Sequence, residues 1–146
     1  MWREMAMDSR RRGRVGVDGR RMASIAMEQG MAAARAHSPF AAADWFRREL
    51  AANPSNLEAK AWLGQSLCVV GQMVEGQALL REAAAALLDL LRGPDAAFAR
   101  AIEVITGLQQ WGDMEGALEP SRRAVAVAPE DARGQRVLAI SCGQLN

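Results

Sequence analysis

The feature that most constrains the fold is an internal repeat that starts near residue 23. At a shift of 34 residues, Gly30 aligns with Gly64 and Phe46 with Leu80. At a shift of 41, the aligned pairs are Leu63 with Val104, Leu67 with Leu108, Gly71 with Gly112, Met73 with Met114 and Ala83 with Ala124. A second shift of 34 aligns Val104 with Leu138 and Leu108 with Cys142. One period of 34 explains every shift if seven residues are inserted near 91–97.

The composition indicates that each repeat is helical. Half of the residues are hydrophobic, mostly Ala, Leu, Val and Met, whereas only 5% are aromatic. Straight-chain residues and alanine lose little freedom in a helix, and the aromatic residues that strands favour are sparse. Capping signals at Ser38-Pro39, Ser55–Glu58, Asp95 and Asp113 mark the starts of helices. The pattern predicts helices over 23–36, 39–52, 56–70, 73–92, 96–111, 114–128 and 132–145.

The period and the order of small and large residues resemble the tetratricopeptide repeat, a helix–turn–helix unit of about 34 residues. The resemblance covers residues 23–146 and implies an all-α, right-handed α-solenoid of antiparallel helix pairs, with about seven helices. Its units are 23–56, 57–97 with the seven-residue insertion, 98–131, and a closing helix at 132–145. Two positions depart from the family pattern: Ile105 stands in place of a glycine and Gly76 in place of an alanine.

The resemblance also implies a binding site, because the first helix of each unit lines an inner groove in this family. We expect that groove to bind a protein or peptide, with an apolar helix or extended segment as the ligand. The implied groove residues are Met27, Met31, Ala61, Gln65, Cys68, Ile102, Thr106, Gln109, Arg133, Arg136 and Ile140. Capture of acidic chaperone tails is not expected, because Met27, Met31, Trp62, Ala99 and Glu103 replace the family's Lys, Asn and Arg at the clamping positions.

The residues that could carry catalysis favour a protein without enzymatic activity. His37 is the only histidine and falls in a predicted turn without a partner base. Cys68 lies in an apolar run, and Cys68 and Cys142 have no accompanying metal-ligand pair. We therefore expect no catalytic residue, no metal and no cofactor. Two unpaired thiols favour a reducing, cytoplasmic location.

Residues 1–22 differ from the rest of the chain. They hold seven Arg against Glu4, Asp8 and Asp18, with no helical apolar stripe, so we expect a flexible basic tail. Such a tail can contact nucleic acid or an anionic membrane surface, or it can be a solvated leader without function, which is the reading we favour. Met22 or Met27 is an alternative start of translation. No stretch reaches the roughly 18 apolar residues of a membrane span.

Several roles fit an interaction module of this kind. The main prediction is a protein–protein interaction scaffold or adaptor, and a more specific alternative is a bacterial secretion-type chaperone. A second alternative is the N-terminal regulatory module of a larger enzyme such as a glycosyltransferase, and a third is a nucleic-acid-associated protein that uses the Arg-rich tail. Apolar residues on more than one face of 132–145 also predict a homodimer, or a partner, packed on that helix.

Overall fold

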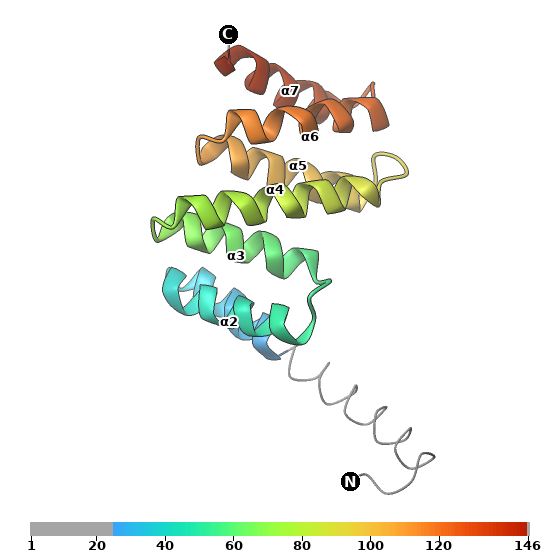
Figure 1. The fold of residues 1–146 in the computed structure, drawn as a ribbon. Helices are drawn as coiled ribbons and strands as arrows, with labels where there is room; N and C mark the ends of the chain where they lie inside the picture. The colour runs from blue at the N-terminus through green and yellow to red at the C-terminus, as the bar shows by residue number, and fades with distance from the viewer. Residues whose placement is uncertain (1–24, 146) are drawn as a thin grey trace, which may run out of the picture.

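The structure is a computed structural model that describes residues 25–145, and these residues form an all-helical stack (Figure 1). Residues 25–35 form the first helix. The remaining helices are α2 (Pro39–Ala52), α3 (Leu57–Val69), α4 (Met73–Asp89), α5 (Ala96–Gln110), α6 (Met114–Val127) and α7 (Ala132–Leu145). The predicted all-α fold class with seven helices is confirmed within the described residues. The basic tail at 1–22 lies outside them.

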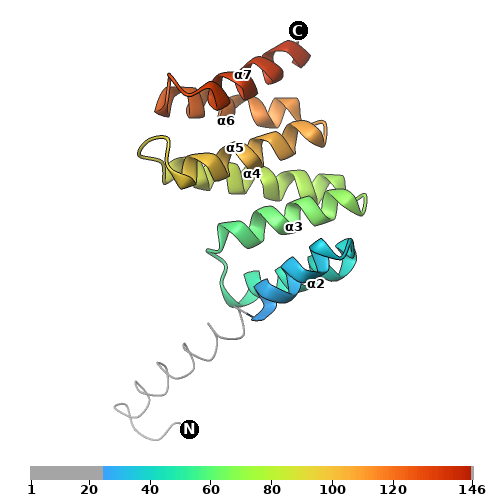
Figure 2. The same ribbon diagram turned by 180° about the vertical axis from the view of Figure 1, so that it is seen from behind.

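The helices form two layers. Each packs against its neighbours in the chain, and α4 also contacts α6 while α5 contacts α7. Helix 25–35, α3, α5 and α7 lie on the face turned toward the viewer in Figure 2, and α2, α4 and α6 lie on the other face. We call the first of these surfaces the first-helix face. Residues 25 and 145 therefore lie at opposite ends of an elongated stack.

The turn inside each helix pair is the same structure three times. A left-handed residue closes the first helix: His37 (φ 57°), Gly71 (φ 89°) and Gly112 (φ 82°). The following residue then donates its N–H to a carbonyl five residues back, from Ser38 to Ala33, Gln72 to Leu67 and Asp113 to Leu108. This is the Schellman cap, which favours glycine because a Cβ is strained at positive φ.

Small residues allow the helices of a pair to approach closely, as the repeat pattern predicts. A Cβ on Gly64 would lie 2.8 Å from the Gly76 carbonyl oxygen, and one on Gly30 would lie 2.6 Å from the Phe46 ring. The large residues beside them, such as Phe46 and Leu80, are fully buried. Close packing of this kind makes the core sensitive to a single added methyl group.

The seven-residue insertion is divided among three elements. Compared with α2, α4 is three residues longer, and compared with α3, α5 is two residues longer. The other two residues enlarge the connecting loop, which has six residues at 90–95 and four at 53–56. The sequence pattern predicts that α4 extends to Arg92. Instead α4 ends at Asp89, and Leu91 turns back into the core.

Side chains cap α3, α5 and α6, whereas the predicted cap Ser38 before α2 makes no side-chain hydrogen bond to its helix. Asp95 accepts from the Phe98 N–H and Asp113 from the Gly116 N–H, as predicted. At α3 the N-cap is Asn56 rather than Ser55, because the Asn56 side chain accepts from the Ala59 N–H while Ser55 donates to Asn53. Helix α6 continues through the buried Pro120.

Candidate functional site: a groove along the first-helix face

Three adjoining hollows follow one another along the first-helix face. The first, of about 500 Å³, is open and is lined by Met27, Glu28, Met31 and Arg35. The second, of about 330 Å³, is lined by Ala34, His37, Pro39, Trp62, Gln65, Ser66 and Val69. The third, of about 180 Å³, is lined by Ala61, Trp62, Gln65, Leu80, Arg100, Glu103, Val104, Gly107 and Gln110. The second and third adjoin at Trp62 and Gln65 of α3, and we call these two hollows together the groove.

Trp62 is the apolar centre of this groove. Its ring stacks on Phe46 with 6.2 Å between ring centroids, which fixes the indole against α2. Its Nε1 atom is buried and has no hydrogen-bond partner in the part of the chain that the structure describes. An unpaired buried donor is rare and costs about 1–3 kcal/mol, so a ligand that accepted a hydrogen bond from Trp62 Nε1 would recover this cost.

Gln65 is the polar centre. Its Oε1 atom accepts a hydrogen bond of 3.0 Å from the Trp111 indole N–H, which orients the amide between α3 and α5. On the opposite wall Gly107 has no side chain, and the only neighbour that a Cβ there would approach is Gln65 Oε1, at 3.4 Å. The missing side chain therefore keeps the hollow between α3 and α5 open.

The charged edge of the groove is formed around Arg100. Its guanidinium pairs with Glu103 on the same helix and lies 3.8 Å from Glu58 on α3. It also lies 6.0 Å from the Trp62 ring, within the range of cation–π attraction. Two carboxylates against one guanidinium give this edge a net negative charge.

The groove residues predicted from the sequence fall into two groups. Met27, Met31, Gln65 and Thr106 are half-buried, and Arg133, Arg136 and Ile140 are exposed. Ala61 lines the third hollow although it is 5% exposed. Cys68, Ile102 and Gln109 are buried, with 2%, 9% and 7% of their surface exposed.

The buried members of that set have structural contacts. Gln109 donates from Nε2 to the Val137 carbonyl at 2.7 Å and to the Ser141 hydroxyl at 2.8 Å, so it joins α5 to α7. Cys68 lies against Gly76, where α3 and α4 cross. Burial, with a smaller effect from the nearby Asp113 carboxylate, raises the pKa of the Cys68 thiol and keeps it protonated.

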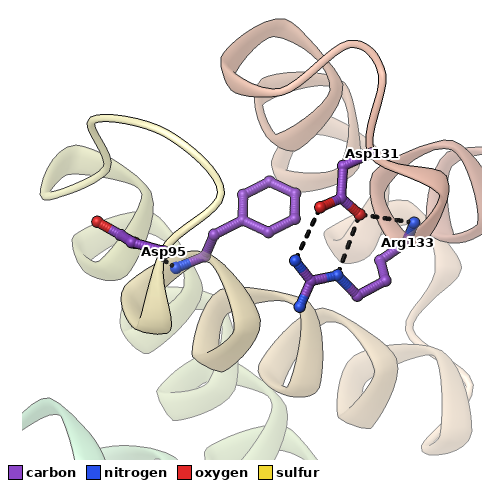
Figure 3. Close-up of polar contacts among 4 residues, drawn as sticks. Asp95, Asp131 and Arg133 are labelled. Atoms are coloured by element: carbon purple, nitrogen blue, oxygen red, sulfur yellow. Dashed lines mark hydrogen bonds and ion pairs between the residues drawn. The ribbon is translucent and has the colours of Figure 1, made fainter.

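At the α7 end, Arg133 is held in place by Asp131 (Figure 3). Its Nε and Nη2 atoms donate to the carboxylate at 3.0 and 2.7 Å, and its backbone N–H donates as well. These hydrogen bonds lower the pKa of Asp131. The guanidinium also lies 5.0 Å from the Phe98 ring centroid, and Asp95 caps the helix turn that carries this ring. Arg133 is therefore fixed, whereas Arg136 makes no ion pair within the described residues.

Sequence reasoning missed Arg100, Gly107 and Gln110 as groove residues. With Glu103 they recur at intervals of three, four and three residues, which places them on one face of α5. That spacing could have identified them. The prediction instead used the alignment with other repeats, which gave Ile102, Thr106 and Gln109. These three residues lie on the adjoining face of α5.

No protein-family model matches this chain, and no curated protein matches it significantly. Among the described residues, no three His, Cys, Asp or Glu side chains gather as a metal site would require. None of the described helices has the length and apolar character needed to cross a membrane.

Proposed function

We propose that the chain is a protein-binding module of the tetratricopeptide type that holds a peptide segment along the first-helix face. One observation carries the proposal: two hollows, one on each side of α3, adjoin at Trp62 and Gln65. An apolar centre flanked by a small number of polar groups is what a recognition groove requires. The unpaired Cys68 and Cys142 suit a cytoplasmic setting for this role.

The lining suggests how a peptide would bind. Trp62, Leu80 and Val104 supply an apolar floor for one large side chain. Gln65 and Gln110 supply amides that can hydrogen-bond a peptide backbone, and the carboxylates beside Arg100 favour a basic residue near the anchor. Because Gln65 is already oriented by Trp111, little side-chain freedom is lost on binding.

The test uses Gly107, because a side chain added there extends toward Gln65 and into the groove. A displayed peptide library is selected against the full chain, and the selected peptides are measured by calorimetry against Gly107→Ala and Gly107→Leu. We expect Gly107→Ala to bind nearly as well as wild type, and Gly107→Leu to bind at least about 10-fold more weakly, roughly 1.4 kcal/mol. Circular dichroism of both variants checks folding. Equal binding by a folded Gly107→Leu variant would show that the peptides bind elsewhere and would overturn the proposal.

A further inference from the structure

The open side of α7 differs from the corresponding side of the other first helices. The repeat register aligns Leu138 with Leu63 and Val104, and Cys142 with Leu67 and Leu108. All four earlier residues are buried, with at most 4% exposed. Leu138 and Cys142 are only half-buried, and Ala139 between them is exposed. We call these three residues the α7 outer face.

The chain itself shows what covers this surface in the earlier units. Helix α4 crosses α3 at Gly64, the residue equivalent to Ala139. Leu63 and Leu67 share a buried cluster with Ala42, Ala43 and Phe46 of α2, and Leu79 of α4 packs against that cluster. Helix α6 likewise packs its Ala117 and Ala124 into the cluster of Ile105 and Leu108. In both units the covering element is an antiparallel helix with a small residue at the crossing.

From this continuity we propose that the α7 outer face binds an acidic amphipathic helix of a partner protein, in the position that α4 has on α3. The charge supports an acidic partner, because α7 contains no acidic residue and its Arg136, unlike the Asp131-paired Arg133, makes no ion pair within the described residues. Arg136 is also exposed. The helix needs a small residue opposite Ala139 and a large apolar residue one turn later, as in Gly76 and Leu80.

A second copy of this chain fits the surface less well. Two α7 helices packed together would bring like charges together and cover one helix face each, far less than the area of a stable dimer. A partner helix placed on α7 as α6 is placed on α5 would also reach α6, since α6 itself contacts both α5 and α4. A partner helix can therefore bury more surface at this site than a second copy of the chain can.

Cys142 provides a built-in reporter. It lies on the α7 outer face and is half-buried, whereas Cys68 is 2% exposed and lies in the core. The rate at which iodoacetamide alkylates Cys142, measured by mass spectrometry, therefore reports whether this surface is covered. Cys68 in the same chain is the internal reference. The probe is a synthetic peptide of residues 72–90, which contains α4 with Glu75, Glu82 and Asp89 against Arg81 and so carries a net charge of −2.

We expect saturating peptide to slow alkylation of Cys142 at least about 5-fold. A scrambled peptide and a peptide with Gly76→Phe should give no protection, because the latter cannot approach Ala139. In the protein, Leu138→Glu should abolish protection. The matched control Ile140→Glu, on the exposed first-helix side of the same helix, should retain it.

Three results would overturn the proposal. The first is no protection at 1 mM peptide, and the second is protection that persists in a folded Leu138→Glu variant. The third is protection that rises with protein concentration without peptide, together with dimer in sedimentation, which would assign the surface to a second copy. Gly107→Leu should leave Cys142 protection unchanged, so failure of the groove proposal is distinguishable from failure of this one.

Discussion

Gly64 on α3 and Gly76 on α4 form the closest crossing of their helix pair: a Cβ on Gly64 would lie 2.8 Å from the Gly76 carbonyl oxygen and 2.9 Å from Leu80 Cγ. A backbone carbonyl cannot move aside as a flexible side chain can. Gly107 is also helical and buried, yet a Cβ there would approach only Gln65 Oε1, at 3.4 Å. Alanine should therefore be poorly tolerated at Gly64 and well tolerated at Gly107.

We expect Gly64→Ala to lower the free energy of unfolding by about 1–3 kcal/mol, because the added methyl group forces α3 and α4 apart. Gly107→Ala should raise it by about 0.5–1 kcal/mol, because alanine is the better helix former and no backbone atom obstructs it. Urea denaturation followed by circular dichroism measures both. Equal destabilisation by both substitutions would contradict the account of the crossing.

The shared turn geometry predicts opposite effects at two equivalent residues. His37 and Gly71 both have positive φ, which costs a residue with a Cβ about 1–2 kcal/mol. Gly71→Ala should therefore destabilise the protein by about 1 kcal/mol, although a Cβ there meets no atom within 4 Å. His37→Gly should leave stability unchanged or raise it by up to about 1 kcal/mol. A thermal melt of each variant tests the pair, and clear destabilisation by His37→Gly would show that this side chain makes a contact more favourable than the strain.

Neighbouring leucines in the enlarged loop provide a third test. Leu91 is 6% exposed and belongs to the main core cluster, whereas Leu90 is 60% exposed. We expect Leu91→Ala to cost about 2–5 kcal/mol through the cavity it leaves. Leu90→Ala should fall within about 0.5 kcal/mol of wild type. Denaturant midpoints for the two variants decide whether the loop is anchored, and similar midpoints would indicate that it is not.

Asp113 predicts a dependence of stability on pH. Burial alone would raise its pKa, but hydrogen bonds from the Arg81 guanidinium and the Gly116 N–H outweigh burial and lower it. A carboxyl with a lowered folded-state pKa stabilises the fold fully above its unfolded value, near ~3.9, and this contribution is lost as the pH falls through the lower folded pKa.

At pH 7 we expect Asp113→Ala to cost about 1–2 kcal/mol, because the α6 cap is lost. The difference from wild type should shrink below about pH 4 as Asp113 becomes protonated. Chemical denaturation from pH 7 to pH 3 measures this, with Glu115→Ala in the first turn of the same helix as the control. A difference that stayed constant across that range would argue against an ionised Asp113 in the fold.

Much of the fold follows from local sequence signals, and the site follows from them only in part. The helix bounds were predictable because caps, glycines and prolines act on their nearest neighbours, as at Asp95 and Gly71. How the seven inserted residues divide between α4, α5 and their loop was not predictable, because the burial of Leu91 depends on the helices that surround it. Gln109 has the polarity of a groove residue, yet two acceptors on α7, the Val137 carbonyl and the Ser141 hydroxyl, draw it inward. Repeat register assigns a residue to a helix face, but the adjoining helix decides whether that face is exposed.

The hydrogen bonds of Gln109 have a consequence for how the stack opens. In a linear array the terminal helix is covered on one side only and is the first to fray. Here the side chain of Gln109, anchored in the buried part of α5, holds the Val137 carbonyl and the Ser141 hydroxyl in the middle and second half of α7. Opening α7 therefore leaves a buried amide without partners, which is costly. Amide protons of α7 should consequently exchange more slowly than its one-sided cover within the described residues would suggest, at rates close to those of α5.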